Sequence, residues 1–289
     1  MAADACFVPV SSYSYSSKTV TVTTKARTMD WSPDGQFLWI GVISDRTAYS
    51  YTGATNWDVT GRTTPTNYRY GFIPEVDSGG DVFSMLINTA PDGTPGGQML
   101  LNLNFGTTFC EIAQYTMPFP YNLRQGDPPA DPASSPKYPL YTPVYIGSYN
   151  TIPDTGADGI HDMRMSPDGT RLIGATSIAA GDVDLVQWNL TVPYDVLGGM
   201  TFQTPVRIAN HGFSAMYIPP SGTCIYLTRL GTIDQFEFGT PWEISTINKT
   251  AVDSLSVSSQ IGGTIASVFV TEDNLYAMKI NSGEIFQYS

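Results

Sequence analysis

Histidine, the side chain most often used for acid–base catalysis near neutral pH, occurs only twice in this sequence. His161 lies in "DGIHDM" and His211 in "NHGFSAM", each just before or within a short apolar run typical of a strand. A catalytic histidine is conceivable there, but a structural one bonded to a backbone carbonyl is the simpler interpretation. The chain has no GxSxG motif and no Ser, His, Asp order of a hydrolase. We therefore predict that neither histidine is catalytic.

Paired carboxylates are the next chemistry to consider, because glycoside hydrolysis needs two acids that flank one bond in a shared pocket. Asp30 precedes a Pro-Asp-Gly turn, Asp81 follows two glycines, and Asp162 follows His161. These contexts differ, which indicates that the three acids do not occupy equivalent positions. We predict that the chain is not an enzyme and has no catalytic residues.

One segment, "DTGADGIHD" at 154–162, partly matches a calcium-binding loop. Asp154, Asp158 and Gly159 fall at positions 1, 5 and 6 of such a loop. Position 3 is a glycine and position 12 is Met165, so the bidentate glutamate that completes the loop is missing. A polar turn that enters a strand explains the segment better, and we predict no metal ion and no cofactor.

The three cysteines, Cys6, Cys110 and Cys224, lie far apart and form no CxxC or Cys/His spacing. Zinc is therefore not expected. The odd and sparse count also argues against a disulfide framework. We predict that all three are plain apolar residues.

Acidic residues outnumber basic ones: the 289 residues carry a formal net charge of −12, and 14% of them are charged. Because no Lys/Arg cluster exists to neutralise phosphates, we expect neither nucleic acid nor an anionic membrane as a partner. The first residues lack the basic and apolar regions of a secretory signal, and no apolar run is long enough to span a membrane. The Tyr-, Ser- and Thr-rich composition is nevertheless typical of an exposed protein.

A pair of Gln followed by an aromatic residue recurs along the chain, with Ser in place of Gln in the first copy. The aromatic residues of the five copies are Tyr51, Tyr115, Trp188, Phe236 and Tyr288. Six residues after the first four of them stand Trp57, Tyr121, Tyr194 and Trp242, each followed by an acid or amide. Proline precedes three of these four second aromatics.

A second landmark keeps phase with the first. Turn sequences lie at 32–35, 90–93, 166–169, 219–222 and 271–274, and "SPDG" is the commonest form. Pro, Asp and Gly in this order favour a tight hairpin turn, and apolar runs flank each turn. The unit is then four antiparallel strands in about 50 residues, repeated five times, which is typical of a β-propeller. We predict an all-β fold: one β-propeller domain over 1–289, with five four-stranded blades.

The ends of the chain offer a way to close the ring. The last unit stops at its third strand, "EIFQYS", and "KTVTVTT" at 18–24 is a spare strand before the first unit. The simplest ring takes 18–24 as the fourth strand of the final blade, which leaves no open edge. An ordinary edge strand is the alternative.

We assign the repeated aromatics to blade packing. The first aromatic of each pair would fill the gap between blades, the second would cover the rim of the adjoining blade, and Gln would bond backbone groups. A ring of sugar-stacking platforms is the alternative.

A Pro-rich stretch at 117–143 holds eight of the 21 prolines and falls between the third and fourth strands of the second blade. Such a stretch cannot form a ladder. It is either a tolerated loop insertion or an arm that grips a neighbouring subunit through Tyr121, Tyr138 and Tyr141.

Two segments carry a resemblance to known repeats. "HDMRMSPDGTRLIGA" resembles the repeats of WD40-like propellers, and "DQFEFGTPWEIST" resembles the "TPWD-IST" repeats of propeller proteins from phages and prophage regions. The resemblance covers most of 26–289, although the first unit lacks the Gln and the Pro and the last lacks a Pro-Asp-Gly turn.

This resemblance implies a non-enzymatic structural or interaction protein, namely a tail-associated component of a bacteriophage virion. Such a protein is made in the host cytoplasm without a signal peptide and leaves inside a particle. Its partners would be other virion proteins, further copies of itself, or the host surface. The alternative is a carbohydrate-binding, lectin-like propeller that recognises a host-surface glycan.

Overall fold

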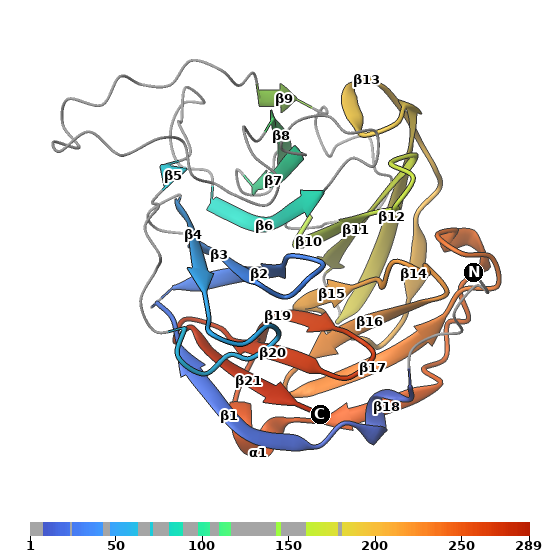
Figure 1. Cartoon of the computed structure of the whole chain (residues 1–289). Helices are drawn as coiled ribbons and strands as arrows, with labels where there is room; N and C mark the ends of the chain where they lie inside the picture. Colours follow the sequence, from blue (N-terminus) through green and yellow to red (C-terminus); the bar gives the residue numbers. More distant parts are fainter. Residues whose placement is uncertain are drawn as a thin grey trace, which may run out of the picture.

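The computed structural model describes residues 8–23, 25–42, 47–62, 70–71, 81–88, 98–104, 110–116, 143–145, 160–178 and 181–289. These residues form five antiparallel sheets arranged around a centre (Figure 1). The first strands of the sheets contact one another in the order β2, β6, β10, β15, β19 and back to β2, which closes a ring. The fold is an all-β propeller, as the repeats predict. No helix in the described ranges is long and apolar enough to cross a membrane.

Four of the sheets contain four strands each. One holds β2 (Ala26–Trp31), β3 (Phe37–Val42), β4 (Thr47–Thr52) and β5 (Tyr70–Gly71). The next holds β6 (Asp81–Asn88), β7 (Gln98–Asn104), β8 (Cys110–Thr116) and β9 (Pro143–Tyr145). Another holds β15 (Ala215–Tyr217), β16 (Cys224–Arg229), β17 (Thr232–Glu237) and β18 (Asp253–Ser256). The last holds β19 (Ile265–Val270), β20 (Leu275–Lys279), β21 (Glu284–Tyr288) and β1 (Tyr15–Thr21).

The remaining sheet has five strands, so the prediction of four strands in every blade is wrong for it. Its strands are β10 (Asp162–Met165), β11 (Arg171–Ile178), β12 (Asp182–Val192), β13 (Asp195–Phe202) and β14 (Val206–Ile208). The long strand β12 pairs with β13 along its second half and with β14 along its first half. The extra strand arises because β12 continues to Val192 and turns back through Pro193.

Four of the turn sequences, at 32–35, 166–169, 219–222 and 271–274, lie in the hairpins that join first and second strands, and the fifth, at 90–93, lies outside the described residues. In the turn after β2, Gly35 donates its N–H to the carbonyl of Ser32 at 2.8 Å, and the Ser32 hydroxyl bonds to Asp34 at 2.5 Å. Ser166, Asp168 and Gly169 repeat these contacts after β10. Both glycines have a positive φ, which glycine adopts without strain.

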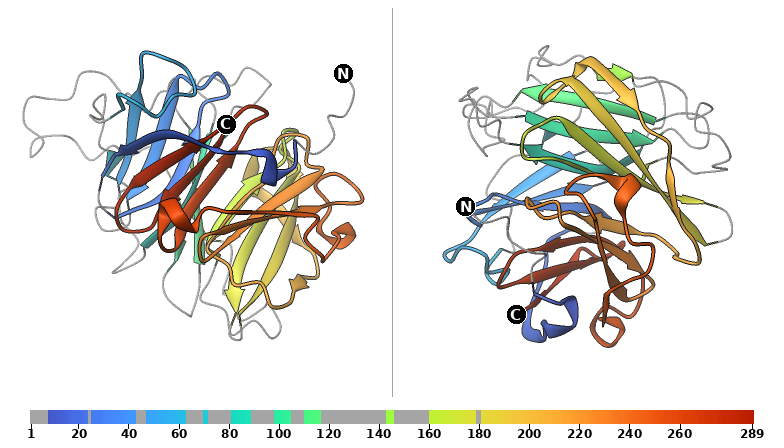
Figure 2. Two further views of the ribbon diagram at one scale, coloured as in Figure 1. Left: turned by 90° about the horizontal axis from the view of Figure 1, so that it is seen from below. Right: turned by 90° about the vertical axis from the view of Figure 1, so that its right-hand side faces the viewer.

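The ring is closed by a strand from the N-terminal part of the chain, as predicted. β1 runs antiparallel to β21, with Lys18 opposite Gln287 and Val20 opposite Ile285. The strand is Tyr15–Thr21 rather than 18–24. Figure 2 shows β1 lying along the outer side of β21.

Three hydrophobic clusters fill the spaces between sheets. One of them joins Leu86 and Ile112 of the sheet β6–β9 to Trp188 of the sheet β10–β14. Another joins Ile173 to Phe236 of the sheet β15–β18. Apolar side chains lie on both sides of each of these sheets, because each sheet is packed between two neighbours.

Three short helical elements lie outside the sheets of the described residues. The 3-10 helices η1 (Val10–Ser12) and η3 (Ile244–Thr246) precede β1 and β18, and α1 (Ser258–Ile261) follows β18. Direct pairing of β8 with β9 places the Pro-rich stretch between the third and fourth strands of its sheet. Residues 117–142 themselves, including Tyr121, Tyr138 and Tyr141, lie outside the described residues.

Candidate functional site

Polar side chains link the first strands to one another around the centre of the ring. The N–H of Met29 bonds to the Ser267 hydroxyl at 3.1 Å, and the N–H of Met85 bonds to the Thr28 hydroxyl at 3.2 Å. The N–H of Met216 bonds to the Asp162 carboxylate at 3.0 Å. In each bond, a side chain of one sheet satisfies a backbone donor of the next sheet. These bonds fix neighbouring sheets in register, since an unpaired buried N–H is costly.

Two residues further along these strands, a layer of larger side chains packs into the centre. Its members are Asp30, Leu86, Arg164, Tyr217 and Phe269, and all of them are buried. The Tyr217 and Phe269 rings lie 4.6 Å apart, and the Arg164 guanidinium lies 5.4 Å from the Tyr217 ring centroid. At this level the side chains of neighbouring first strands pack against one another.

One ion pair lies inside this packed centre. Arg164 donates to the Asp162 carboxylate at 3.1 Å and to the carbonyl of Met163 at 2.8 Å. Burial raises the pKa of Asp162, and the Arg164 charge with two backbone N–H bonds offsets part of that shift. Burial also raises the pKa of Tyr217. Arg164 Nη1 makes both bonds to Asp162 and Met163, and its Nε and Nη2 are buried without a hydrogen-bond partner.

The acids considered for catalysis lie at different levels of the ring. Asp162 on β10 and Thr28 on β2 lie at the same distance from the turn that follows their strand. Asp30 lies two residues nearer to that turn, so Asp30 and Asp162 occupy non-equivalent positions. Asp81 is the first residue of β6, and its side chain is outside the described part. Among the described residues, no group of three His, Cys, Asp or Glu could hold a metal ion. Asp154, Asp158 and Gly159 lie outside that part.

His211 is bonded to a carboxylate rather than to the backbone carbonyl that we expected. Its Nε2 lies 3.0 Å from Asp234 Oδ2, and Asp234 also accepts from Ser254 and Arg229. Burial alone would raise the pKa of Asp234, but the bonds from His211 and Ser254 and the Arg229 charge hold it below its ordinary value. The Asp234 carboxylate therefore ties three segments of one sheet together. The backbone N–H of His161 bonds to Ala175 at 2.8 Å.

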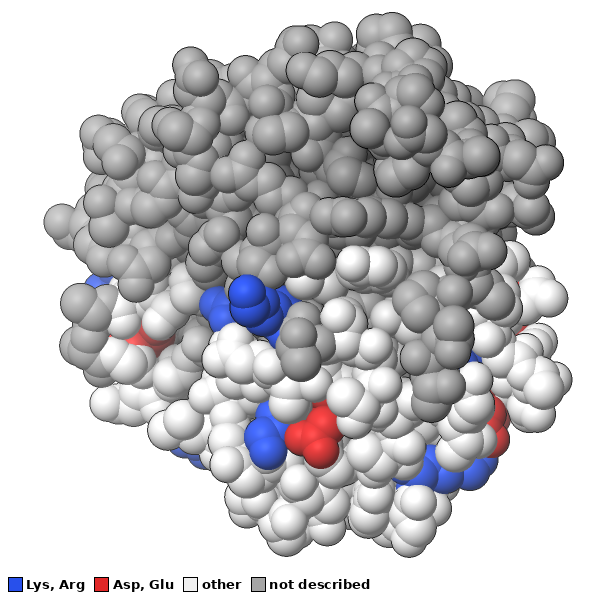
Figure 3. All heavy atoms as spheres, turned by 90° about the vertical axis from the view of Figure 1, so that its left-hand side faces the viewer, with Lys and Arg blue, Asp and Glu red and all other residues white. Residues whose placement is uncertain are grey.

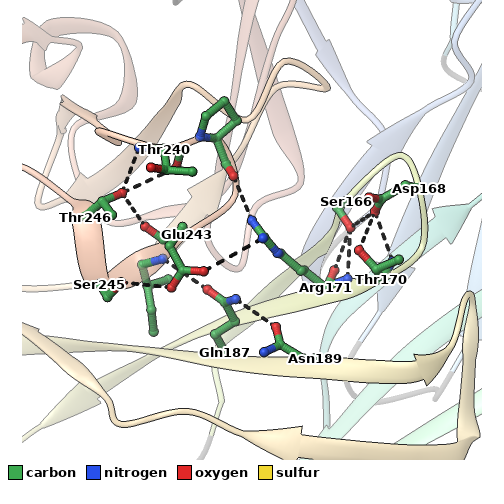
Figure 4. A network of polar contacts seen from close by, with 12 residues as sticks. Ser166, Asp168, Thr170, Arg171, Gln187, Asn189, Thr240, Glu243, Ser245 and Thr246 are labelled. Carbon is green, nitrogen blue, oxygen red and sulfur yellow. Dashed lines mark hydrogen bonds and ion pairs between the residues drawn. The ribbon is translucent and has the colours of Figure 1, made fainter.

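The described glutamines of the repeats bond to a segment of the following sheet. Gln187 Oε1 accepts from the N–H of Ile244 at 3.0 Å, and Gln287 Oε1 accepts from the N–H of Val59 at 3.3 Å. Figure 4 shows Arg171 at the first of these junctions, where it donates to the carbonyl of Pro241 at 2.8 Å and approaches Glu243 at 3.9 Å. The proline and the acid of the motif thus meet the neighbouring sheet.

The second aromatic of the motif covers a glycine of its own sheet. Trp57, Tyr194 and Trp242 each adopt a positive φ, which is rare for aromatic residues. Their N–H groups bond to the carbonyls of Gly35, Gly169 and Gly222 at 3.0, 2.9 and 2.9 Å respectively. A Cβ placed on any of these glycines would overlap the ring above it. Two independent reasons therefore favour glycine at these positions: the backbone has a positive φ, and the aromatic ring leaves no space for a Cβ.

The first aromatics occupy the clusters between sheets. Tyr51, Trp188, Phe236 and Tyr288 are buried, and each belongs to one of the three clusters. Tyr115 lies on β8, where its side chain is not described. Tyr194 and Trp242 are each 6% exposed, so their faces are not open for stacking a sugar ring.

The fifth copy of the motif continues at the other end of the chain, which sequence reasoning missed. The N–H of Val10 in η1 bonds to Gln235 Oε1 at 2.9 Å, as Ile244 in η3 does to Gln187. Val10-Ser11-Ser12 thus occupies the place of Ile244-Ser245-Thr246 in the sheet that β21 and β1 complete. The only sequence signal for this role was the similarity of Val10-Ser11-Ser12 to Ile244-Ser245-Thr246. The aromatic residue that precedes the second segment is missing from the first.

A second missed residue is Arg62, whose side chain is fully buried. Its guanidinium donates to the carbonyls of Asp58, Gln36, Tyr51, Gly35 and Thr55 at 2.7 to 3.2 Å. It also lies 4.7 Å from the Trp31 ring centroid. Burial lowers the pKa of Arg62. A lone arginine in a loop gives no sequence signal for such a role.

The prediction that all three cysteines are plain apolar residues is wrong. Cys224 is disulfide-bonded, and its partner is not among the described side chains. An odd number of cysteines does not exclude a disulfide, because two of the three can form one bond and leave the third as a free thiol.

Figure 3 shows the charged groups on one face of the molecule, of which a part is described. On the face in Figure 3, the described atoms are mostly uncharged, and the basic and acidic groups are separate or adjoin each other in small pairs. The described part of this face therefore offers no broad basic patch of the kind that binds nucleic acid.

Comparisons with known proteins reach no further than the fold. No family model and no curated protein matches the sequence. Among solved structures, the chain is similar to the β-propeller domain of Cps50 (Swd1) from Myceliophteria thermophila, with 15% identity over 90% of this chain and 65% of that one and a TM-score of 0.39. It is also similar to Raptor from Chaetomium thermophilum, with 8% identity over 96% of this chain and 29% of that one and a TM-score of 0.46. For a luciferin-regenerating enzyme, the identity is 12% over 92% of this chain and 73% of that one, with a TM-score of 0.47.

Proposed function

We propose that this propeller is a non-enzymatic structural and interaction protein, and that each of its five sheets is one blade. The observation that carries the proposal is the packing of buried side chains on neighbouring first strands, where Tyr217 lies against both Arg164 and Phe269. The acids nearest to it are held by internal bonds. Since these buried groups bond to one another, we place the function of the chain on its rims and outer surface.

The more specific form of the proposal is a tail-associated component of a bacteriophage virion that mediates assembly or host-surface contact. Its support is the resemblance of "DQFEFGTPWEIST" to repeats of phage propeller proteins and the rigid closure of the ring by β1. A closed ring can carry load at its rims without opening an edge. The Pro-rich stretch at 117–143 is the proposed assembly arm.

The experiment compares the oligomeric state of three proteins by size-exclusion chromatography with light scattering. They are the full chain, a variant in which residues 122–140 are replaced by a Gly-Ser linker, and the triple variant Tyr121→Ser, Tyr138→Ser, Tyr141→Ser. We expect a defined multimer for the full chain and a monomer for the linker variant, with the triple variant shifted toward monomer. The monomer mass of the full chain is 31.4 kDa.

A monomeric full chain would overturn the assembly role of the arm. The lectin alternative would then be examined on a glycan array. The burial of the Tyr194 and Trp242 rings does not favour that alternative, because sugar binding by stacking needs an exposed ring face.

A further inference from the structure

The segment 10–21, which contains η1 and β1, is held by residues from the far end of the chain. Its partners there are Gln235, Asp253, Thr271, Ser289 and the strand β21. Lys18 also forms an ion pair at 2.8 Å with Asp58, which follows β4. All of these partners lie in the sheet that β1 completes, in the two sheets beside it in the ring, or in their loops. A second copy of the ring therefore offers this segment the same set of partners.

The connection from β1 to β2 is short for the path that it follows. β1 is the outermost strand of its sheet, in the order β1-β21-β20-β19, and β2 is the innermost strand of the next sheet. Because strands lie about 4.8 Å apart, the chain has to cross about 14 Å from the edge to the centre. Only positions 22–25 separate Thr21 from Ala26, and five residue steps span at most about 18 Å. The connection has little slack.

This connection is also strained in the described structure. Lys25 has a φ of +65°, a left-handed conformation that disfavours a lysine by about tenfold. The N–H of Lys25 bonds to the carbonyl of Asn281 at 3.3 Å, and the N–H of Val22 bonds to that of Gly283 at 3.0 Å. A Cβ on Gly283 would lie 1.7 Å from the carbonyl oxygen of Thr23, so the connection is pressed onto the turn between β20 and β21. Short and strained hinges favour the exchange of an element between copies.

We propose that two copies of this chain exchange β1, so that η1 and β1 of each copy complete the outer sheet of the other. Each ring keeps a closing strand, and the bonds of the segment 10–21 to its partners are all reproduced. The exchange straightens the two connections and releases Lys25 from its left-handed conformation. This inference rests on the closure of the ring by β1 and does not depend on the proposed function.

The strain sets the concentration at which exchange occurs. A short connection holds β1 beside the β21 of its own chain at an effective concentration of about 1 mM. A dimer releases two connections, and about tenfold for each lowers this value by about 100-fold. We therefore expect half of the chains to have exchanged β1 at about 10 µM.

The first experiment uses cysteines placed across the pair of β1 and β21, because they report which copy supplies the strand. Thr21 lies opposite Glu284, and both side chains are at least partly exposed. Chains with Thr21→Cys and chains with Glu284→Cys are refolded together from urea under reducing conditions, oxidised, and separated on a non-reducing gel. We expect a covalent dimer at about 100 µM and roughly fivefold less of it at about 1 µM. The wild type and each variant alone are the controls for links through the native cysteines.

A mixture that gives no more covalent dimer than these controls at about 100 µM would overturn the proposal. The double variant Thr21→Cys, Glu284→Cys separates strand exchange from the proposed assembly arm. A multimer in which this variant links only within single chains would overturn strand exchange and leave the arm in place. A link between chains that persists when residues 122–140 are replaced by a linker would support exchange, whatever the arm does.

The second experiment relieves the hinge. Lys25→Gly adopts a positive φ without strain, so the dimer midpoint measured by light scattering should rise by about 100-fold. The control is Asn210→Gly, at another position with a positive φ, +57°, away from the hinge. It should leave the midpoint unchanged. A midpoint that Lys25→Gly does not move would contradict the proposal.

Discussion

The main chains of Ser14 and Ser289 exchange two hydrogen bonds, with N to O distances of 3.0 and 2.9 Å. The two residues are 275 positions apart, yet they form one step of the ladder that β1 and β21 continue. The last sheet is therefore built from both ends of the described chain. Its stability depends on contacts that no local segment can make alone.

The glutamine bonds between sheets give the first prediction. Gln187→Leu keeps the volume of the side chain but leaves the N–H of Ile244 without its acceptor. We expect the free energy of unfolding to fall by about 1–3 kcal/mol, the cost of an unsatisfied buried donor. Urea denaturation followed by tryptophan fluorescence measures it. The control, Gln36→Leu at an exposed turn position, should change stability by less than about 0.5 kcal/mol.

The glycines beneath the aromatic rings give the second prediction. Gly222 has φ +66° and lies under the Trp242 ring, whereas Gly262 has φ +58° with open space around its Cα. Gly262→Ala should cost about 1 kcal/mol from backbone strain alone. Gly222→Ala should cost about 3 kcal/mol, because overlap with the ring adds to the strain. Equal losses in calorimetric unfolding would show that the ring contact is not a constraint.

Arg62 gives the third prediction. Its planar guanidinium donates to five carbonyls from the turn at 35–36, from β4 and from the loop at 55–58. A lysine ammonium has only three donors and lacks the fork. Arg62→Lys should lower the free energy of unfolding by about 3 kcal/mol. Arg171→Lys, at a partly exposed side chain that donates to the carbonyl of Pro241 and approaches Glu243, should lower it by less than about 1 kcal/mol. Chemical denaturation of both variants shows whether the stability depends on the positive charge of Arg62 or on the planar arrangement of its donors.

The fourth prediction concerns acid stability. The folded chain lowers the pKa of Asp34, Asp58, Asp168, Asp234 and Asp253. A carboxylate with a lowered folded pKa contributes stability that is complete above its unfolded value of about 3.9 and is lost as the pH falls through the folded value. We expect the free energy of unfolding to decline between about pH 5 and pH 2.

The variant Asp234→Asn tests how much of this acid response comes from Asp234, the buried one of the five aspartates. The variant should be less stable at pH 7 by about 1–3 kcal/mol, and its stability should decline less steeply below pH 5. Glu272→Gln, at an exposed position, is the control and should keep the wild-type slope. An unchanged slope for Asp234→Asn would mean that the other four aspartates carry the acid response.

The sequence was sufficient for the propeller, because each unit repeats a turn sequence and an aromatic pair at a fixed spacing. It also located the closing strand, since "TVTVTT" alternates and lies before the first unit. It was not sufficient for β13, because nothing local distinguishes a strand that continues through Val192 from one that stops at Trp188. Pairing partners decide such boundaries.

The junctions between sheets were harder to predict for the same reason. Gln187 and Ile244 are 57 residues apart, and only the ring brings them together. The role of Val10 was hidden because its segment keeps the backbone geometry of η3 without the aromatic that marks it elsewhere. Cys224 was misjudged because sequence spacing does not report which residues ring closure brings near one another.

The pairing of β1 with β21 also sets the order of events during synthesis. Strands such as β2, β3 and β4 can pair as soon as they leave the ribosome, but β1 must wait until residues 284–288 have been made. At about 5–20 residues per second, that delay is on the order of tens of seconds. During this time β1 has been synthesised but its partner β21 has not. A chaperone can bind β1 in this interval, or β1 can pair with a wrong strand.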